Sequence, residues 1–94
     1  MLLNLERLLQ ESTVPGGKFV SSPITINSEY VISIKPASSR WSSIKEVNNR
    51  PVKNCHATEI CISNGDSVES VVVLGRYEDL VEKIKGKSRS ILYG

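Results

Sequence analysis

The chain has 94 residues, of which 39% are hydrophobic and 5% aromatic, and its net charge at pH 7 is +2. This length predicts one small soluble domain, residues 1–94, and the scarcity of aromatic residues argues against binding of nucleic acid mainly by base stacking. The sequence holds neither an apolar run of membrane-spanning length nor a secretory signal pattern, and its two cysteines are too few for a disulfide framework. We therefore expect a cytoplasmic protein that does not bind a membrane.

The N-terminal segment has leucines at helical intervals, namely Leu2, Leu5, Leu8 and Leu9. A Val-Pro-Gly-Gly turn follows at residues 14–17. The spacing predicts an amphipathic helix that runs to about Glu11. Such a helix would pack on a sheet or, alternatively, present its leucines to a partner, because a helix this short is marginal in water by itself.

Three segments with strand character follow, at residues 18–20, 24–26 and 30–35. In the third segment Tyr30, Ile32 and Ile34 alternate along the chain, which predicts a strand with these side chains on one face. Pro23 indicates an interruption or an edge strand, since proline cannot donate a hydrogen bond to a sheet. The short connections favour antiparallel pairing.

Residues 36–56 predict a long basic loop, which is too long to be a mere connection and is therefore of functional interest or disordered. Its charged residues are Arg40, Lys45, Glu46, Arg50 and Lys53. Trp41, the single tryptophan, lies beside Arg40, which suggests a stacking platform for a base, a nucleotide or a partner side chain. The alternative is that Trp41 holds the loop against the core by its own burial.

Residues 58–74 predict a β-hairpin, because two β-branched runs flank Asn64-Gly65. A two-residue loop at Asn64-Gly65 would pair apolar residues with polar ones. A three-residue loop, Ser63-Asn64-Gly65, sets Ile60 opposite Val68 instead, and we expect this longer loop.

This register makes further predictions for the same hairpin. It places Thr58, Val72 and Leu74 on the side of Ile60, and it sets Glu59 opposite Glu69 as a like-charge pair. Residues 71–74 are apolar on both faces. We therefore expect another segment to cover the outer side of this strand.

A helix over residues 77–85 is indicated by an apolar stripe at i, i+3, i+4 and i+7, made of Tyr77, Leu80, Val81 and Ile84. Acidic residues in its first turn and lysines in its last match the helix dipole, and Gly86 is a natural stop. The predicted fold class is therefore α+β: a small antiparallel sheet of four to five strands, with the N-terminal helix and this C-terminal helix packed on it.

Residues 86–94 form a basic C-terminal tail, and the cations at this end are Lys83, Lys85, Lys87 and Arg89. Such a tail binds phosphates non-specifically or simply stays solvated. Ile91-Leu92-Tyr93 is a candidate last edge strand, in this chain or in the sheet of a neighbour. Residues 57–82 carry Arg76 against six carboxylates, so basic and acidic segments alternate, and a homodimer with complementary surfaces is plausible.

No stretch of the sequence predicts a reaction, a metal or a cofactor. Cys55, His56 and Cys61 do not have the spacing of a standard zinc site. Adjacent residues of an extended segment point to opposite faces, which makes Cys55 and His56 a poor nucleophile and base. A small hydrolase that uses either residue ranks behind the two binding functions given at the end of this section. Gly86-Lys87-Ser88 resembles the end of a phosphate-binding loop but follows a helix rather than preceding one.

Four segments resemble a known family when taken in order: residues 17–19, 24–34, 58–65 and 77–84. They resemble the FlbD-like small proteins, in which "G-x-x-F", an "I-x-x-I" strand, an "I-x-L-x-N-G" hairpin and an "S-x-E-E-V-x-x-K-I" helix follow in this order. Similar short proteins are common among uncharacterised bacteriophage products. The leucine-rich start, the basic loop and the basic tail depart from the family pattern. The resemblance implies a small non-enzymatic regulatory or interaction protein, and no site residues carry over.

These observations predict a non-enzymatic protein-interaction or regulatory module, which the resemblance extends to a phage-encoded modulator or inhibitor of a host protein. The alternative is binding of nucleic acid or a nucleotide through the basic loop and tail. For either partner the candidate binding residues are Arg40, Trp41, Lys45, Arg50, Lys53, Lys85, Lys87 and Arg89.

Overall fold

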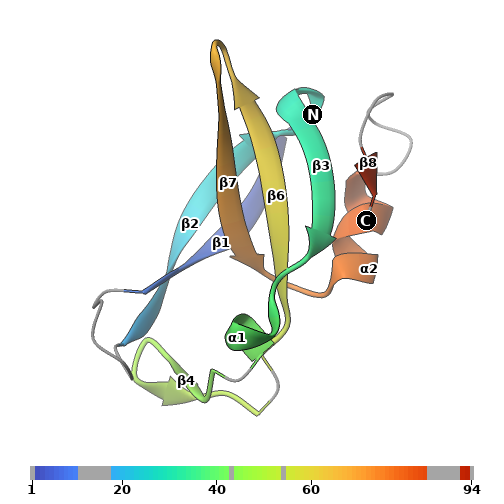
Figure 1. Cartoon of the computed structure of the whole chain (residues 1–94). Coiled ribbons are helices and arrows are strands. Elements are labelled where there is room, and N and C mark those ends of the chain that lie inside the picture. Colours follow the sequence, from blue (N-terminus) through green and yellow to red (C-terminus); the bar gives the residue numbers. More distant parts are fainter. Residues whose placement is uncertain (1, 11–17, 43, 54, 85–91, 94) are drawn as a thin grey trace.

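The computed structural model describes residues 2–10, 18–42, 44–53, 55–84 and 92–93, and most of them lie in β-strands (Figure 1). The main sheet has six strands in the order β2-β1-β7-β6-β3-β8, of which the first five pair antiparallel and β8 pairs parallel to β3. These strands are β1 (Leu2–Gln10), β2 (Phe19–Asn27), β3 (Val31–Pro36), β6 (Ala57–Asn64), β7 (Ser67–Leu74) and β8 (Leu92–Tyr93).

The remaining elements are short apart from one helix. They are η1 (Ser28–Tyr30), α1 (Ser39–Ser42), β4 (Glu46–Val47), β5 (Arg50–Pro51) and α2 (Tyr77–Ile84). Strands β4 and β5 pair with each other as a separate two-stranded sheet. The sequence also predicts an edge strand at residues 91–93. Residues 92–93 form β8, which pairs with β3 of the same chain, and Ile91 lies outside the described residues.

The predicted N-terminal helix is wrong, because residues 2–10 form strand β1, and with it the predicted two-helix arrangement fails. In β1 the side chains of Leu3 and Leu5 are buried while that of Leu2 is 66% exposed. This is the two-residue period of a strand, whereas the helical stripe required Leu2 and Leu5 to be buried together. The strand prevails because it pairs along its whole length with β2, which supplies the hydrogen bonds that a helix would have made internally.

The predicted hairpin register is also wrong. The turn between β6 and β7 is Gly65-Asp66, with Asn64 opposite Ser67 and Gly65 at φ 71°. Ile60 therefore lies opposite Val71, not Val68, and Val68 on the other face is 65% exposed. This register buries Ile60 and Val71 together in the core, which the predicted one did not allow.

The shifted register moves the carboxylates of the hairpin as well. Glu59 lies opposite Val72 rather than Glu69, and Thr58 lies opposite Val73. Glu69 lies opposite Ile62, so the expected like-charge pair does not form. Each glutamate instead has a cationic neighbour, Lys35 for Glu59 and Arg7 for Glu69.

The strands before residue 36 differ from the predicted ones in two ways. The segments at 18–20 and 24–26 merge into β2, an outermost strand in which Pro23 lies opposite Glu6. In β3 a register shift between Val31 and Ser33 breaks the alternation. Val31 and Ile34 are consequently the buried residues, and Tyr30, which was expected to share a face with Ile34, is 58% exposed in η1.

The main core lies between the β1–β2 hairpin, the strands β7, β6 and β3, and helix α2, which Figure 1 shows beside β3. Its buried residues come from all of these elements: Leu3, Leu5, Ile26, Val31, Ile34, Ile60, Val71, Val73, Leu80 and Ile84. The predicted stripe of α2 is confirmed, because Leu80 and Ile84 are buried and Tyr77 and Val81 pack against the cluster. Gly86, the predicted stop, lies outside the described residues.

A second hydrophobic cluster covers the outer side of β7, as expected from its two apolar faces. Its buried residues are Leu8, Ile44, Val47 and Cys55, and its partly buried ones are Phe19, Trp41, Val52, Ala57, Val72 and Leu74. Much of this cover comes from the segment 36–56, which carries α1, β4 and β5. The segment that connects β3 to β6 thus contributes a core of its own.

Candidate functional site

The structure brings three predicted cationic residues together on one short hairpin. We call residues 45–53 the cationic hairpin; it contains β4 and β5 and bears the exposed side chains of Lys45, Arg50 and Lys53. Its two ends meet where the Val52 amide donates to the Lys45 carbonyl, at an N–O distance of 2.8 Å. None of the three cations forms an ion pair with another described residue.

Asn48 fixes the cationic hairpin to the edge of β2. The turn residues Asn48 and Asn49 have φ angles of 55° and 63°, a region that asparagine tolerates better than most residues. The Asn48 amide donates to the Phe19 carbonyl at 3.0 Å. Its side chain accepts a hydrogen bond from the Ser21 amide and donates one to the Ser21 hydroxyl, each at 2.9 Å. Val47 is buried in the second cluster, so the hairpin is held from two sides.

Lys18 is a fourth cation at this end of the molecule that the sequence did not indicate. It is exposed and directly precedes Phe19, whose carbonyl accepts from Asn48. The contact joins residues 19 and 48 from distant parts of the chain. No local pattern in the sequence signals this proximity, because it depends on a backbone hydrogen bond between segments that are far apart in the chain.

The aromatic candidate, Trp41, packs inward. It is partly buried in the second cluster, and its ring meets that of Phe19 edge to face, with centroids 5.8 Å apart and an interplanar angle of 68°. Arg40 lies beside it on α1. The predicted residues Lys85, Lys87 and Arg89 lie outside the described residues, so the tail is not part of the site that the structure describes.

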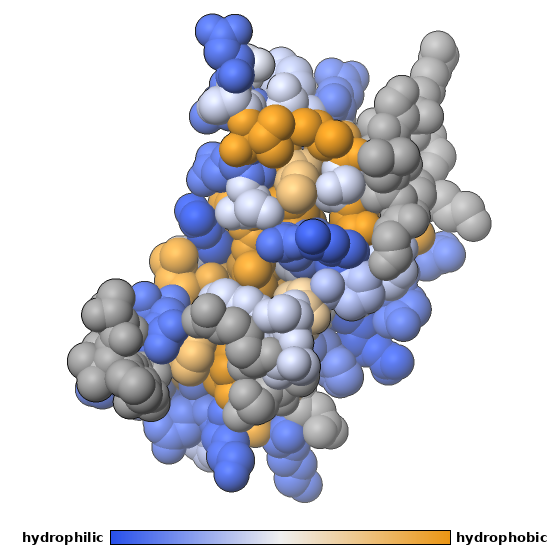
Figure 2. Space-filling model, in the orientation of Figure 1, coloured by the Kyte–Doolittle hydropathy of each residue, from blue (hydrophilic) through white to orange (hydrophobic). Residues whose placement is uncertain are grey.

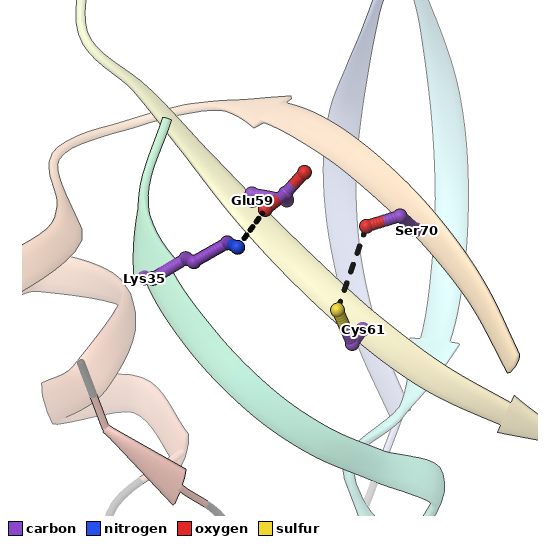
Figure 3. Close-up of polar contacts among 4 residues, drawn as sticks. All are labelled: Lys35, Glu59, Cys61 and Ser70. Atoms are coloured by element: carbon purple, nitrogen blue, oxygen red, sulfur yellow. Dashed lines mark hydrogen bonds and ion pairs between the residues drawn. The ribbon is translucent and has the colours of Figure 1, made fainter. Parts of the chain in front are cut away.

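Two polar contacts cross the outer faces of β3, β6 and β7 (Figure 3). Lys35 Nζ lies 2.9 Å from Glu59 Oε2, and Cys61 Sγ lies 3.4 Å from Ser70 Oγ. Each contact joins residues that are directly opposite on neighbouring strands. The hydrogen bond to Glu59 and the charge of its carboxylate raise the pKa of Lys35. These contacts are the ordinary cross-strand pairs of a solvated sheet face and mark no reaction.

Cys55 and His56, the candidate nucleophile and base, differ in their exposure. Cys55 is buried in the second cluster, while His56 is exposed. Burial raises the pKa of the Cys55 thiol, which disfavours the thiolate that a nucleophile needs. A cavity of about 220 Å³ borders both residues, together with Pro36, Ala57, Arg76, Tyr77 and Glu78. Within the described ranges no three His, Cys, Asp or Glu side chains are grouped so that they could hold a metal ion.

Comparison with family models, with curated proteins and with solved structures finds no match for this chain. The resemblance to the FlbD-like proteins therefore stays a prediction. Among the described residues, no helix is both long and apolar enough to span a membrane.

Proposed function

We propose that this chain is a non-catalytic interaction module that binds an acidic surface of another protein through the cationic hairpin. One observation carries the proposal. Lys45, Arg50 and Lys53 are exposed and have no ion-pair partner among the described residues, on a hairpin anchored by Asn48.

The electrostatics of the hairpin favour an anionic partner. Residues 45–53 carry three cations against the single carboxylate of Glu46. Like charges on so short a segment repel one another, and carboxylates of a partner would relieve that repulsion while steering the approach over a Debye length of about 8 Å at physiological salt. Anchoring of the turn lowers the entropy that binding has to remove.

The packing of Trp41 favours a protein over a nucleic acid as the partner. A stacking platform for bases needs an exposed ring face, whereas Trp41 is partly buried against Phe19. Glu46 within the hairpin also opposes a row of phosphates. Nucleic-acid binding stays the alternative that the experiment below separates from the proposal.

The proposal also covers the cellular compartment and the biological role of the chain. A reducing cytoplasm agrees with two free cysteines, Cys55 and Cys61. The FlbD-like resemblance supports a regulatory role, such as that of a phage-encoded modulator of a host protein, and the thiol burial of Cys55 supports a role without catalysis.

The test is a binding titration with two fluorescent probes: an aspartate- and glutamate-rich peptide and a single-stranded oligonucleotide of equal charge. The peptide is expected to bind. Arg50→Glu should weaken its binding about threefold, and joint reversal of Lys45, Arg50 and Lys53 about tenfold or more, since each exposed ion pair contributes up to about 1 kcal/mol.

Lys83→Glu is the matched control, because Lys83 is exposed on α2, outside the cationic hairpin. Its effect on peptide binding should stay below twofold. Stronger binding of the oligonucleotide, with affinity that falls steeply with salt and is lost on Arg50→Glu, would favour the nucleic-acid alternative. Equal effects of Arg50→Glu and Lys83→Glu would refute a role for the hairpin.

A further inference from the structure

A groove of about 350 Å³ opens at the end of the molecule that carries the β6–β7 turn, which Figure 1 shows opposite β4. Five elements contribute to its walls: β1 with its first residue, β2, η1, and the ends of β6 and β7 near their shared turn. The apolar residues that line it are Leu2, Ile24, Ile26, Tyr30, Ile62 and Val71.

The groove collects the exposed hydrophobic surface of the molecule. Within the described part of the chain, the exposed large hydrophobic residues are Leu2, Tyr30 and Val68, and the first two line the groove. Ile24 and Ile62, which also line the groove, are partly buried and pack against the main core. Figure 2 shows hydrophobic residues at the surface near this end, bordered by hydrophilic residues at the tip. A small domain seldom leaves such a patch open unless something binds there.

The border of the groove is acidic. Glu69 lines it, Glu29 precedes the lining residue Tyr30, and Asp66 lies in the neighbouring turn, and all three side chains are exposed. Of the residues that the structure describes, no lysine or arginine lines the groove. Arg7 reaches Glu69 at 3.8 Å, but both side chains are partly solvated, so this pair neutralises little of the charge.

We infer that this groove is a docking site for a peptide segment of a partner protein that alternates apolar and cationic side chains. The apolar side chains would pack on Leu2 and Tyr30, and the lysines or arginines would lie against Glu29, Asp66 and Glu69. Charge complementarity selects this occupant, because an acidic segment would be repelled at the same border. The site goes beyond the proposed function, whose partner has the opposite charge and meets the other end of the molecule.

The experiment titrates the full chain with a fluorescein-labelled peptide of alternating leucine and lysine. Two control peptides alternate leucine with glutamate and serine with lysine. The leucine–lysine peptide is expected to bind at least tenfold more tightly than either control, because only it has both the apolar and the cationic groups. Equal binding of the serine–lysine peptide would mean attraction by charge alone and would overturn the site.

Variants locate the binding. Leu2→Ser combined with Tyr30→Ala should weaken leucine–lysine binding about tenfold, whereas Val68→Ser should change it less than twofold. Val68 is the matched control, because it is 65% exposed, as Leu2 is at 66%, and does not line the groove. All three residues are on the surface, so the variants are expected to fold. Glu69→Lys should weaken the leucine–lysine peptide and strengthen the leucine–glutamate peptide.

Further outcomes separate this site from the cationic hairpin and from self-association. Joint reversal of Lys45, Arg50 and Lys53 should leave leucine–lysine binding unchanged, and the groove variants should leave binding of the acidic peptide unchanged. Equal losses from Val68→Ser and from the groove variants would overturn the site. Sedimentation of a dimer that Tyr30→Ala dissociates would also overturn it, by making a second copy the occupant.

Discussion

Asn48 connects the cationic hairpin to β2 through its backbone amide and through its side chain. It occupies a positive-φ position and makes two side-chain hydrogen bonds to Ser21, while the adjacent Asn49 has the same backbone region and no hydrogen bond to a described residue. Glycine adopts positive φ without strain, so replacing either asparagine by glycine isolates the side-chain bonds.

Asn48→Gly is expected to lower the free energy of unfolding by about 1–2 kcal/mol, because two hydrogen bonds are lost. Asn49→Gly should change it by less than about 0.5 kcal/mol. Urea denaturation measures both. Equal effects of the two variants would show that the Ser21 contacts contribute nothing to stability.

Cys55 links stability to pH on the alkaline side. Burial raises its folded-state pKa above the ordinary value of 9.0, so the folded state holds the thiol proton more tightly than the unfolded state. Its contribution is fully present below pH 9 and is lost as the pH rises through the folded-state pKa. Stability should therefore fall above pH 9, and the fall should be smaller in Cys55→Val, as measured by urea denaturation across this range. An identical fall in wild type and variant would contradict the prediction.

At the scale of elements, Gly75 sets the connection from β7 to α2. Its φ angle is 137°, its amide donates to the His56 carbonyl at 2.9 Å, and its carbonyl accepts from the hydroxyl of buried Thr58 at 3.0 Å. A Cβ at this position would meet Leu80 Cδ1 at 3.6 Å, an ordinary contact. Any destabilisation would therefore come from the backbone conformation rather than from crowding.

Gly75→Ala is expected to destabilise the fold by about 1–3 kcal/mol, because an alanine seldom adopts this φ. Gly65→Asn is the control: φ at Gly65 is 71°, which asparagine accepts, and a Cβ at this position would have no heavy atom within 4 Å. Its effect should stay below about 0.5 kcal/mol. Thermal denaturation of the two variants would check the difference, and equal shifts would contradict it.

The elements differ in how far their sequence predicts them. Helix α2 was predictable because a stripe from Tyr77 to Ile84 has a single period, and the need to cover β7 followed from its two apolar faces. The strand at residues 2–10 was not predictable, because leucines at positions 2, 5, 8 and 9 fit a helix while Leu3 and Leu5 fit a strand. The choice depends on pairing with β2, which no local window contains.

Dependence on residues that are distant in the sequence also explains why the register of the β6–β7 hairpin and parts of the two candidate sites were not predicted. Gly65 fits the left-handed region in more than one loop, and only burial of Val71 and Val73 in the main core selects the observed turn. The cations of residues 45–53 were identifiable by composition, whereas Lys18 joins them only because Asn48 binds β2. The groove depends on residues of β1, β2, η1, β6 and β7, which are far apart in the sequence, and gave no local signal.

At the scale of the whole molecule, which has extents of 38 × 27 × 21 Å, two hydrophobic clusters pack on opposite faces of β7. The second cluster supports the cationic hairpin. Phe19 serves both, because its ring packs in the cluster and its carbonyl accepts a hydrogen bond from the Asn48 amide of the hairpin. The two proposed binding surfaces thus lie at opposite ends and depend on different clusters. A module of this form could hold two partners of opposite charge at once.

Phe19→Ala is expected to loosen residues 36–56 while the main core stays folded, because the ring packs only in the second cluster. Hydrogen exchange should become faster at the amides of Asn48 and Val52, by roughly the factor of ten that about 1.4 kcal/mol of local stability represents. The amides of Ile60 and Val71 should keep their protection. Uniform loss of protection across both clusters would show that they unfold as one unit.

Pro23 has a consequence for association at high concentration. Asn48 meets β2 at Phe19 and Ser21 from outside the sheet, so by alternation the backbone of Pro23 also faces outward, where it offers no N–H. An edge with a missing donor and an occupied end is a poor template for fibril growth. Pro23→Val should restore the donor and accelerate aggregation, which is measured as a faster rise in light scattering than for the native chain.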